Sequence, residues 1–200
     1  MIVLGAGGHA KEVLDILIEN NYSKEIIFYD NLIKSEKKLY DKYIVTNTLE
    51  NLYYKQDEFI VAVGNVKLRQ KLASIATKHN LRRVGIRSNS LKIGFVNVDI
   101  DSTVDIMHNV IISSDVKIQK DTLINRNVSI HHDVIIGENC VISPGVQLLG
   151  GCEIGNNVFI GAGANIFPKV KIEDDSVIGA GSLVNKSISK SSIVFGNPAR

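Results

Sequence analysis

Apolar residues recur along this 200-residue chain in two different periods, one in each half. Before about residue 84, short apolar runs alternate with segments whose apolar positions lie three and four apart. This is the pattern of buried strands followed by amphipathic helices. We expect strands at 2–4, 26–29 and 59–63, with helices after the first and third. Successive βα units of this kind predict a small α/β domain with a parallel sheet over residues 1–86.

In the second half an aliphatic residue returns at every sixth position, and a small or β-branched residue stands four places after most of them. The aliphatic positions are Ile100, Ile106, Ile112, Ile118, Ile124, Ile130, Ile136, Ile142, Leu148, Ile154, Ile160, Ile166, Ile172, Ile178 and Val184. This period fits neither a helix nor a hairpin and is typical of hexapeptide β-helices. Three hexads make one triangular coil, so 100–189 predict five coils stacked roughly 4.8 Å apart. We expect 87–99 to be a junction and 190–200 a C-terminal tail.

Composition removes several classes of function. The 23 Lys and Arg residues against 21 Asp and Glu leave a net charge of +2 without a long basic run, which does not support nucleic-acid binding. No apolar stretch approaches the roughly 20 residues of a membrane span. Two cysteines and the absence of a signal-like opening indicate a cytoplasmic protein.

Positions eighteen apart stack in adjacent coils, so the second half can be arranged in columns. The pair His132–Asp133 then lies above Ser114–Asp115 and below Gly150–Gly151, which predicts a bare ledge beside an imidazole and a carboxylate. A neutral imidazole is a suitable base for acyl transfer, and a carboxylate near its second nitrogen fixes the tautomer. The neighbouring His131 remains an alternative base, and a solvated polar corner is the interpretation without chemistry.

A second column consists of three small corners, Ser143–Gly145, Gly161–Gly163 and Gly179–Gly181. Small residues there predict a groove in which backbone groups accept an extended pantetheine arm. The preference of tight turns for glycine explains the same residues equally well.

The segment Gly5–Ala10 fits the G-x-G-x-x-G/A pattern between a strand and a helix, and Asp30 ends the next strand. Backbone amides at a helix N-terminus bind phosphate. Only about 85 residues precede the repeats, too few for two mononucleotide halves, so a single nucleotide fits better. For His9, a packing or capping role is the alternative.

Together with the closing Val194–Arg200, these features resemble the hexapeptide-repeat sugar acyltransferases over nearly the full chain. The similar subgroup contains sialic acid O-acetyltransferases and N-acetyltransferases of UDP- or dTDP-linked 4-amino sugars. The resemblance implies a Rossmann-like nucleotide-sugar domain, a left-handed parallel β-helix and a homotrimer with active sites between subunits. It also implies acetyl-CoA as co-substrate and a place in glycan biosynthesis.

The resemblance carries over to individual residues. It makes His132 the general base and Asp133 its helper, with Asp in place of the Glu of some members. Contacts to acetyl-CoA are implied at Val141, Gly150, Ala162 and Ala180. Contacts to the sugar nucleotide are implied at Gly7, Gly8, His9, Asp30 and Gly64.

We therefore expect an N-acetyltransferase acting on a nucleotide-linked 4-amino-dideoxy sugar. Sialic acid O-acetylation is the nearest alternative, because both nucleophiles need the same base. A nicotinamide oxidoreductase and a non-catalytic solenoid are further alternatives. No metal is expected, since His108 stands in a different column from His132, and the inward Cys140 and Cys152 are explained by packing.

Overall fold

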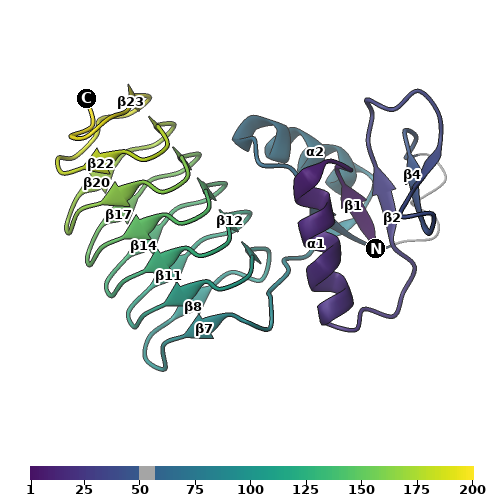
Figure 1. Ribbon diagram of the computed structural model, residues 1–200, viewed down its shortest axis with the longest axis horizontal. Helices are drawn as coiled ribbons and strands as arrows, with labels where there is room; N and C mark the ends of the chain where they lie inside the picture. Colours follow the sequence, from purple (N-terminus) through teal and green to yellow (C-terminus); the bar gives the residue numbers. More distant parts are fainter. Residues whose placement is uncertain (50–56) are drawn as a thin grey trace. The chain divides into compact units, whose positions relative to one another are not determined.

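The computed structural model of the chain describes residues 1–49 and 57–200. These residues form two compact units, Met1–Ile86 and Arg87–Arg200, each with its own hydrophobic core (Figure 1). Within the described ranges, no helix has the length and apolar character needed to cross a membrane.

The described part of the first unit is built on a six-stranded sheet in the order β3-β4-β2-β1-β5-β6. Its strands are β1 (Ile2–Leu4), β2 (Ile27–Tyr29), β3 (Lys37–Leu39), β4 (Tyr43–Thr46), β5 (Glu58–Val61) and β6 (Arg82–Arg83). All pairings are parallel except that of β3 with β4. The hydrophobic pattern identified β1, β2 and β5 but missed β3, β4 and β6. The edge strand β3 is short and largely exposed, so it carries no buried face for a pattern to reveal.

Two helices, α1 (Gly8–Glu19) and α2 (Val66–Lys78), cover this sheet in the described residues. The connections β1-α1-β2 and β5-α2-β6 run in opposite directions along the sheet, so right-handed crossovers place the helices on opposite faces. Consecutive residues of a strand, which point to opposite faces of the sheet, are accordingly both buried, as at Ile2 and Val3. The apolar positions three and four apart predict a buried Leu68 on α2 together with Leu72, and for Leu68 this is wrong, because it is 40% exposed. Arg69 is buried in its place and donates from Nη1 to the carbonyl oxygens of Val61 and Val63, at 2.9 and 3.1 Å.

The second unit is a parallel β-helix of three sheets (Figure 1). One sheet contains β7 (Lys92–Ile93), β10 (Ile111–Ile112), β13 (Ser129–Ile130), β16 (Gln147–Leu148), β19 (Asn165–Ile166) and β22 (Leu183–Val184). The next contains β8 (Asp99–Ile100), β11 (Lys117–Ile118), β14 (Ile135–Ile136), β17 (Glu153–Ile154) and β20 (Lys171–Ile172). The third contains β9 (Asp105–Ile106), β12 (Leu123–Ile124), β15 (Val141–Ile142), β18 (Phe159–Ile160), β21 (Val177–Ile178) and β23 (Ile193–Val194).

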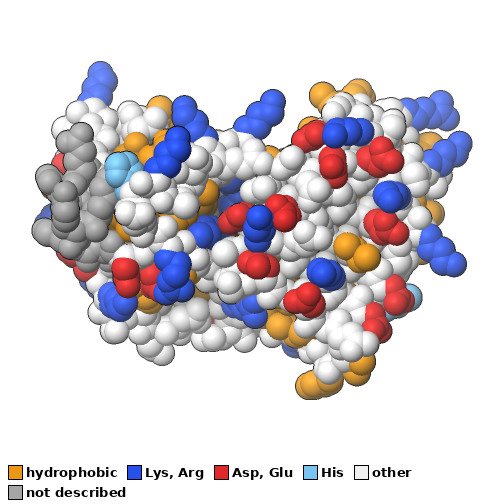
Figure 2. Space-filling view, turned by 180° about the vertical axis from the view of Figure 1, so that it is seen from behind, with side chains coloured by type: hydrophobic (Ala, Val, Ile, Leu, Met, Phe, Trp, Pro, Cys, Tyr) orange, Lys and Arg blue, Asp and Glu red, His pale blue; other side chains and the backbone are white. Residues whose placement is uncertain are grey.

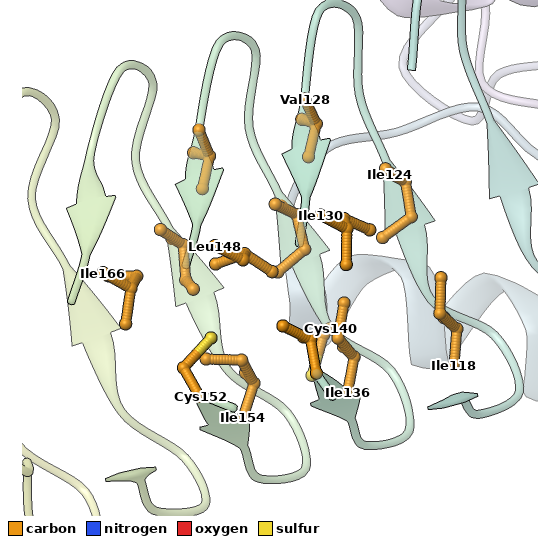
Figure 3. Packing of buried hydrophobic residues seen from close by; sticks show 14 of the residues in the cluster. Ile118, Ile124, Val128, Ile130, Ile136, Cys140, Leu148, Cys152, Ile154 and Ile166 are labelled. Carbon is orange, nitrogen blue, oxygen red and sulfur yellow. The ribbon is translucent and has the colours of Figure 1, made fainter. Parts of the chain in front are cut away.

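From β8 to β22 the expected spacing of eighteen residues is the strand register, whereas β7 pairs with β10 at a spacing of 19 and β21 with β23 at a spacing of 16. Ile112 pairs with Ile130, and Ile130 pairs with Leu148. The periodic aliphatic side chains are buried except Ile100, which is partly exposed in the first coil. Figure 3 shows them stacked in the interior, with Cys140 and Cys152 among them. The sequence therefore predicted the core of the β-helix correctly.

From Asn109 to Gly181, every sixth residue is a corner residue in the left-handed conformation. Asp133, Gly151 and Gly163 have φ of 60°, 71° and 69°, and the corresponding residues of other corners have similar values. Only glycine, and to a lesser degree Asn and Asp, adopts this conformation readily. Their recurrence at the corners is thus a requirement of the backbone.

The winding extends beyond the boundaries expected for it. Strand β7 pairs with β10, and Arg87 bridges to Ile106, so 87–99 already belong to the first coils. At the other end β23 pairs with β21, which makes part of 190–200 a final strand. The segment around Phe95–Val98 breaks the repeat in sequence but not the winding of the backbone.

Charged side chains cover the outside of the second unit in pairs of opposite sign. Lys117 lies 3.8 Å from Asp99, and Lys171 lies 3.3 Å from Glu153, each pair joining adjacent coils. Figure 2 shows one face of the molecule, on which acidic and basic side chains are interspersed. Such exposed pairs contribute little to stability.

The two neighbours Ile135 and Ile136 provide a test of the inward pattern. Ile136 is fully buried, whereas Ile135 is 44% exposed. We expect Ile136→Ala to lower the free energy of unfolding by about 2–5 kcal/mol, because it leaves a cavity. Ile135→Ala is expected to change it by only about 0.5 kcal/mol. Urea unfolding followed by circular dichroism measures both, and equal losses would contradict the inward assignment.

Candidate active site

His132 lies on the corner that joins β13 to β14, where its side chain is 65% exposed. Its Nδ1 is 2.7 Å from Oδ2 of Asp133, so the aspartate reaches the ring although it is one methylene shorter than glutamate. Because a carboxylate only accepts hydrogen bonds, Nδ1 carries a proton, and in the neutral ring the lone pair is then on Nε2. This is the tautomer that a general base needs at Nε2.

The ledge above His132 is not vacant. A Cβ built on Gly150 would lie 2.5 Å from Cε1 and 2.7 Å from Nε2 of His132. The imidazole itself therefore occupies the space that a side chain at position 150 would need. The expected proximity of His132 and Gly150 is found, but the expected empty notch is corrected to a site filled by the ring.

The corner below shows that Asp133 has a structural reason for its identity as well. Asp115, one coil earlier, has φ of 59°, close to the 60° of Asp133. The Asp115 carboxylate accepts a hydrogen bond from Asn97 Nδ2 at 2.8 Å. Unlike Asp133, it stands at a corner without a histidine beside it. An aspartate at this corner is thus favoured by its backbone, and its chemical role needs a test that keeps the turn intact.

His131 is exposed at the end of β13, and its backbone N–H donates to Leu148 O at 2.9 Å. Within the described residues its ring has no carboxylate partner comparable to Asp133. The geometry favours His132 over His131 as the base.

The column of small corners lies on another edge of the β-helix. Ala162 and Ala180 are exposed there, and the left-handed Gly163 and Gly181 have open space above them. Some of the backbone groups expected to receive a pantetheine arm are already used, since Gly163 N donates to Pro144 O and Gly181 N to Ala162 O. The column offers a smooth, small surface with fewer free polar groups than expected.

The expected cofactor residues do not gather around His132. The corner of Ala162 joins β18 to β19, and the corner of His132 joins β13 to β14, so the sheet of β13 and β19 separates them. Val141 lies on β15 in another sheet and is buried, at 2% exposure. Of these residues only Gly150 shares the edge of His132.

The expected sugar-nucleotide residues do gather, at the carboxyl edge of the first unit's sheet. The loop with Gly7 and Gly8 follows β1, Asp30 follows β2 and Gly64 follows β5. Since β2 and β5 flank β1 on either side, this is the point at which the strand order reverses. Parallel α/β sheets bind ligands at such points.

The N-terminus of α1 is open for an anion. Its N-cap, Gly7, makes no side-chain cap bond, and a Cβ at Gly7, Gly8 or Gly64 would meet no described residue within 4 Å. The N-terminus of α2, in contrast, is capped by Asn65, whose side chain accepts from Leu68 N at 2.9 Å. Uncapped amides of this kind favour phosphate.

His9 and Asp30 border this loop. His9 Nδ1 lies 3.1 Å from Glu12 Oε2, while its Nε2 is buried and has no hydrogen-bond partner among the described residues. Asp30 Oδ1 accepts from Leu32 N at 2.9 Å, and Oδ2 has no donor within the part of the chain that the structure describes. The Glu12 contact gives His9 a local packing role that the sequence left open.

Comparison with family models covers both units. The PglD N-terminal domain matches residues 1–76, and the six-repeat bacterial transferase hexapeptide matches residues 115–150, 133–168 and 151–186. The chain belongs to the hexapeptide-repeat acyltransferases that carry a PglD N-terminal domain. It is thereby an enzyme of the transferase class.

Solved structures resemble this acyltransferase over its full length. The acetyltransferase domain of PglB from Neisseria gonorrhoeae FA1090 is 25% identical, with a TM-score of 0.88 over 100% of this chain and 97% of that one. PerB from Caulobacter crescentus, solved with CoA and GDP-perosamine, is 28% identical, with a TM-score of 0.86 over 100% and 95%. WeeI from Acinetobacter baumannii AYE, 24% identical with a TM-score of 0.89 over 100% and 97%, shows the shared fold.

The positions of the two thiols of the acyltransferase predict that both are unreactive. Cys140 and Cys152 are buried in the β-helix, and burial raises the pKa of each thiol to about 12. At pH 8 only about one thiol in 10⁴ is then a thiolate, the reactive form.

We expect no reaction of the folded protein with Ellman's reagent at pH 8 and reaction of both thiols in guanidinium. Rapid reaction of the folded protein would contradict a closed interior.

Proposed function

We propose that this acyltransferase transfers an acetyl group from acetyl-CoA to the 4-amino group of a nucleotide-linked dideoxy sugar, with UDP or dTDP as the nucleotide. The observation that carries the proposal is the exposed His132–Asp133 pair, in a chain that shares its whole fold with PglB and PerB. Binding of CoA and GDP-perosamine by PerB supports both the co-substrate and the substrate class. Because the sugar bound by PerB is linked to GDP, the substrate panel below includes GDP-linked sugars.

In the proposed reaction the amine nitrogen bonds to the thioester carbonyl carbon directly. Nε2 of His132 takes the proton released from that nitrogen, and the carbon–sulfur bond breaks to release CoA. Asp133, 2.7 Å from Nδ1, stabilises the imidazolium that forms. The buried, largely protonated Cys140 and Cys152 are unsuited to act as nucleophiles, which supports direct transfer.

The sugar nucleotide is proposed to bind at the carboxyl edge of the first unit's sheet. The open amides at Gly7 and Gly8 suit the pyrophosphate, with His9 and Gly64 beside it. Oδ2 of Asp30, which has no donor among the described residues, suits an N–H group of the nucleobase.

We further propose that each active site is shared between copies in a homotrimer. Within one chain, Ala162 and Ala180 lie on a different edge from His132, one side of the coil away, which is about 20 Å for six extended residues. They also lie on later coils, further along the axis. A second copy placed edge to edge can bring its small corners opposite His132 without any change of fold. The exposed Ala162 and Ala180 are then the surface along which acetyl-CoA lies.

Release of CoA with a panel of UDP-, dTDP-, GDP- and CMP-linked sugars and free sialic acid tests the proposed reaction. We expect turnover with a 4-amino sugar nucleotide, and His132→Ala to lower it by about 10²–10⁴, the usual contribution of a general base. Asp133→Asn keeps a residue that tolerates the left-handed turn and removes the carboxylate, so it should lower turnover without loss of Tm. Turnover confined to sialic acid, or a fully active His132→Ala, would refute the proposal.

Co-expression of two inactive variants tests the shared site. Ala162→Phe obstructs the proposed cofactor corner, and His132→Ala removes the base. In mixed trimers about one quarter of the interfaces then combine an intact His132 with an intact corner, so activity should recover to about that fraction. Activity that stays at the level of the single variants would place both halves of the site on one chain.

A further inference from the structure

We propose that Gly150 is a positioning residue for His132: its lack of a side chain lets the imidazole lie against the corner, where Asp133 holds Nδ1. This role rests on the proposed function of His132 as the base. It differs from a contact to acetyl-CoA, because Gly150 here acts through another side chain of the same coil stack.

The first argument is the position of the ring. A Cβ at Gly150 would lie 2.5 Å from Cε1, 2.7 Å from Nε2 and 3.2 Å from Nδ1 of His132. All three nearest atoms belong to the imidazole. A methyl group at this position and the ring in its present orientation exclude each other.

The second argument is that the backbone does not require glycine here. Gly145, Gly151, Gly163 and Gly181 have φ between 68° and 72°, which L side chains rarely adopt, whereas Gly150 is not in that region. At other close approaches, such as Gly161, the nearest atoms are backbone atoms of the next coil. The side chain of His132 is therefore the feature that makes position 150 intolerant of a Cβ.

The third argument concerns what happens when the ring is displaced. Both His132 and Asp133 are 65% exposed, so the imidazole has room to rotate into solvent and leave the backbone unchanged. Rotation separates Nδ1 from Asp133 and turns Nε2 away from its present direction. A displacement of about 1 Å in a catalytic group is enough to cost roughly 10²-fold in rate.

The test compares Gly150→Ala with Gly151→Ala. We expect Gly150→Ala to lower kcat by about 10–100-fold at unchanged Tm and unchanged KM for acetyl-CoA. Gly151 has the opposite properties: its φ of 71° is strained for alanine, while a Cβ there meets only Lys169 Cγ, at 3.6 Å. Gly151→Ala should therefore lower Tm with little effect on kcat. A raised KM for acetyl-CoA with normal kcat in Gly150→Ala would assign Gly150 to the cofactor and overturn the proposal.

A double-mutant cycle and the ring tautomer separate this role from a structural one. In a His132→Ala background, Gly150→Ala should lower kcat by less than about twofold, since residues that act as a unit are not additive. In ¹⁵N-histidine spectra, the Nδ1–H tautomer of His132 should be lost in Gly150→Ala and kept in Gly151→Ala. Additive losses, or an unchanged tautomer, would overturn the positioning role. A fully active His132→Ala would refute the proposed function itself, whatever the tautomer shows.

Discussion

Burial in the narrow interior of the β-helix is the constraint on which this molecule depends. Each hexad provides one aliphatic and one small side chain, and both must point inward for the coil to close. Ile130 and Leu148 stack in register, and the small position is filled by residues such as Val146 and Cys152. Because apolar side chains fill the interior, chemistry is confined to the corners and the outward faces. The position of His132 on a corner follows from that restriction.

The corners combine two demands on sequence. They need residues that adopt the left-handed conformation, and they are the places where side chains reach solvent. Asp133 meets both demands, since its φ is 60° and its carboxylate contacts His132. At Gly151 the backbone demand acts alone, while at Gly150 the neighbouring ring decides. Adjacent glycines in this chain thus have different physical origins.

Much of this could be predicted from the sequence because the β-helix is periodic. The inward positions, the stacking of Gly150 over His132 and the glycine loop between β1 and α1 all follow from local pattern. The separation of Ala162 from His132 was also readable, because their sequence distance is not a multiple of eighteen. By contrast, strand β3 carries no buried face, and the orientation of the imidazole depends on a side-chain rotamer. The spacing of residues along the chain therefore predicts neither the strand β3 nor the orientation of the ring.

The strict register also limits how such a chain can change in length. Inserting or deleting a whole coil moves every later residue along the axis and keeps it on its own edge. A single added hexad between His132 and Ala162 would instead rotate all later corners by one third of a turn. The corner of Ala162 would then lie on a different edge and face a neighbouring copy differently. We therefore expect tolerated length changes in this region to be complete coils.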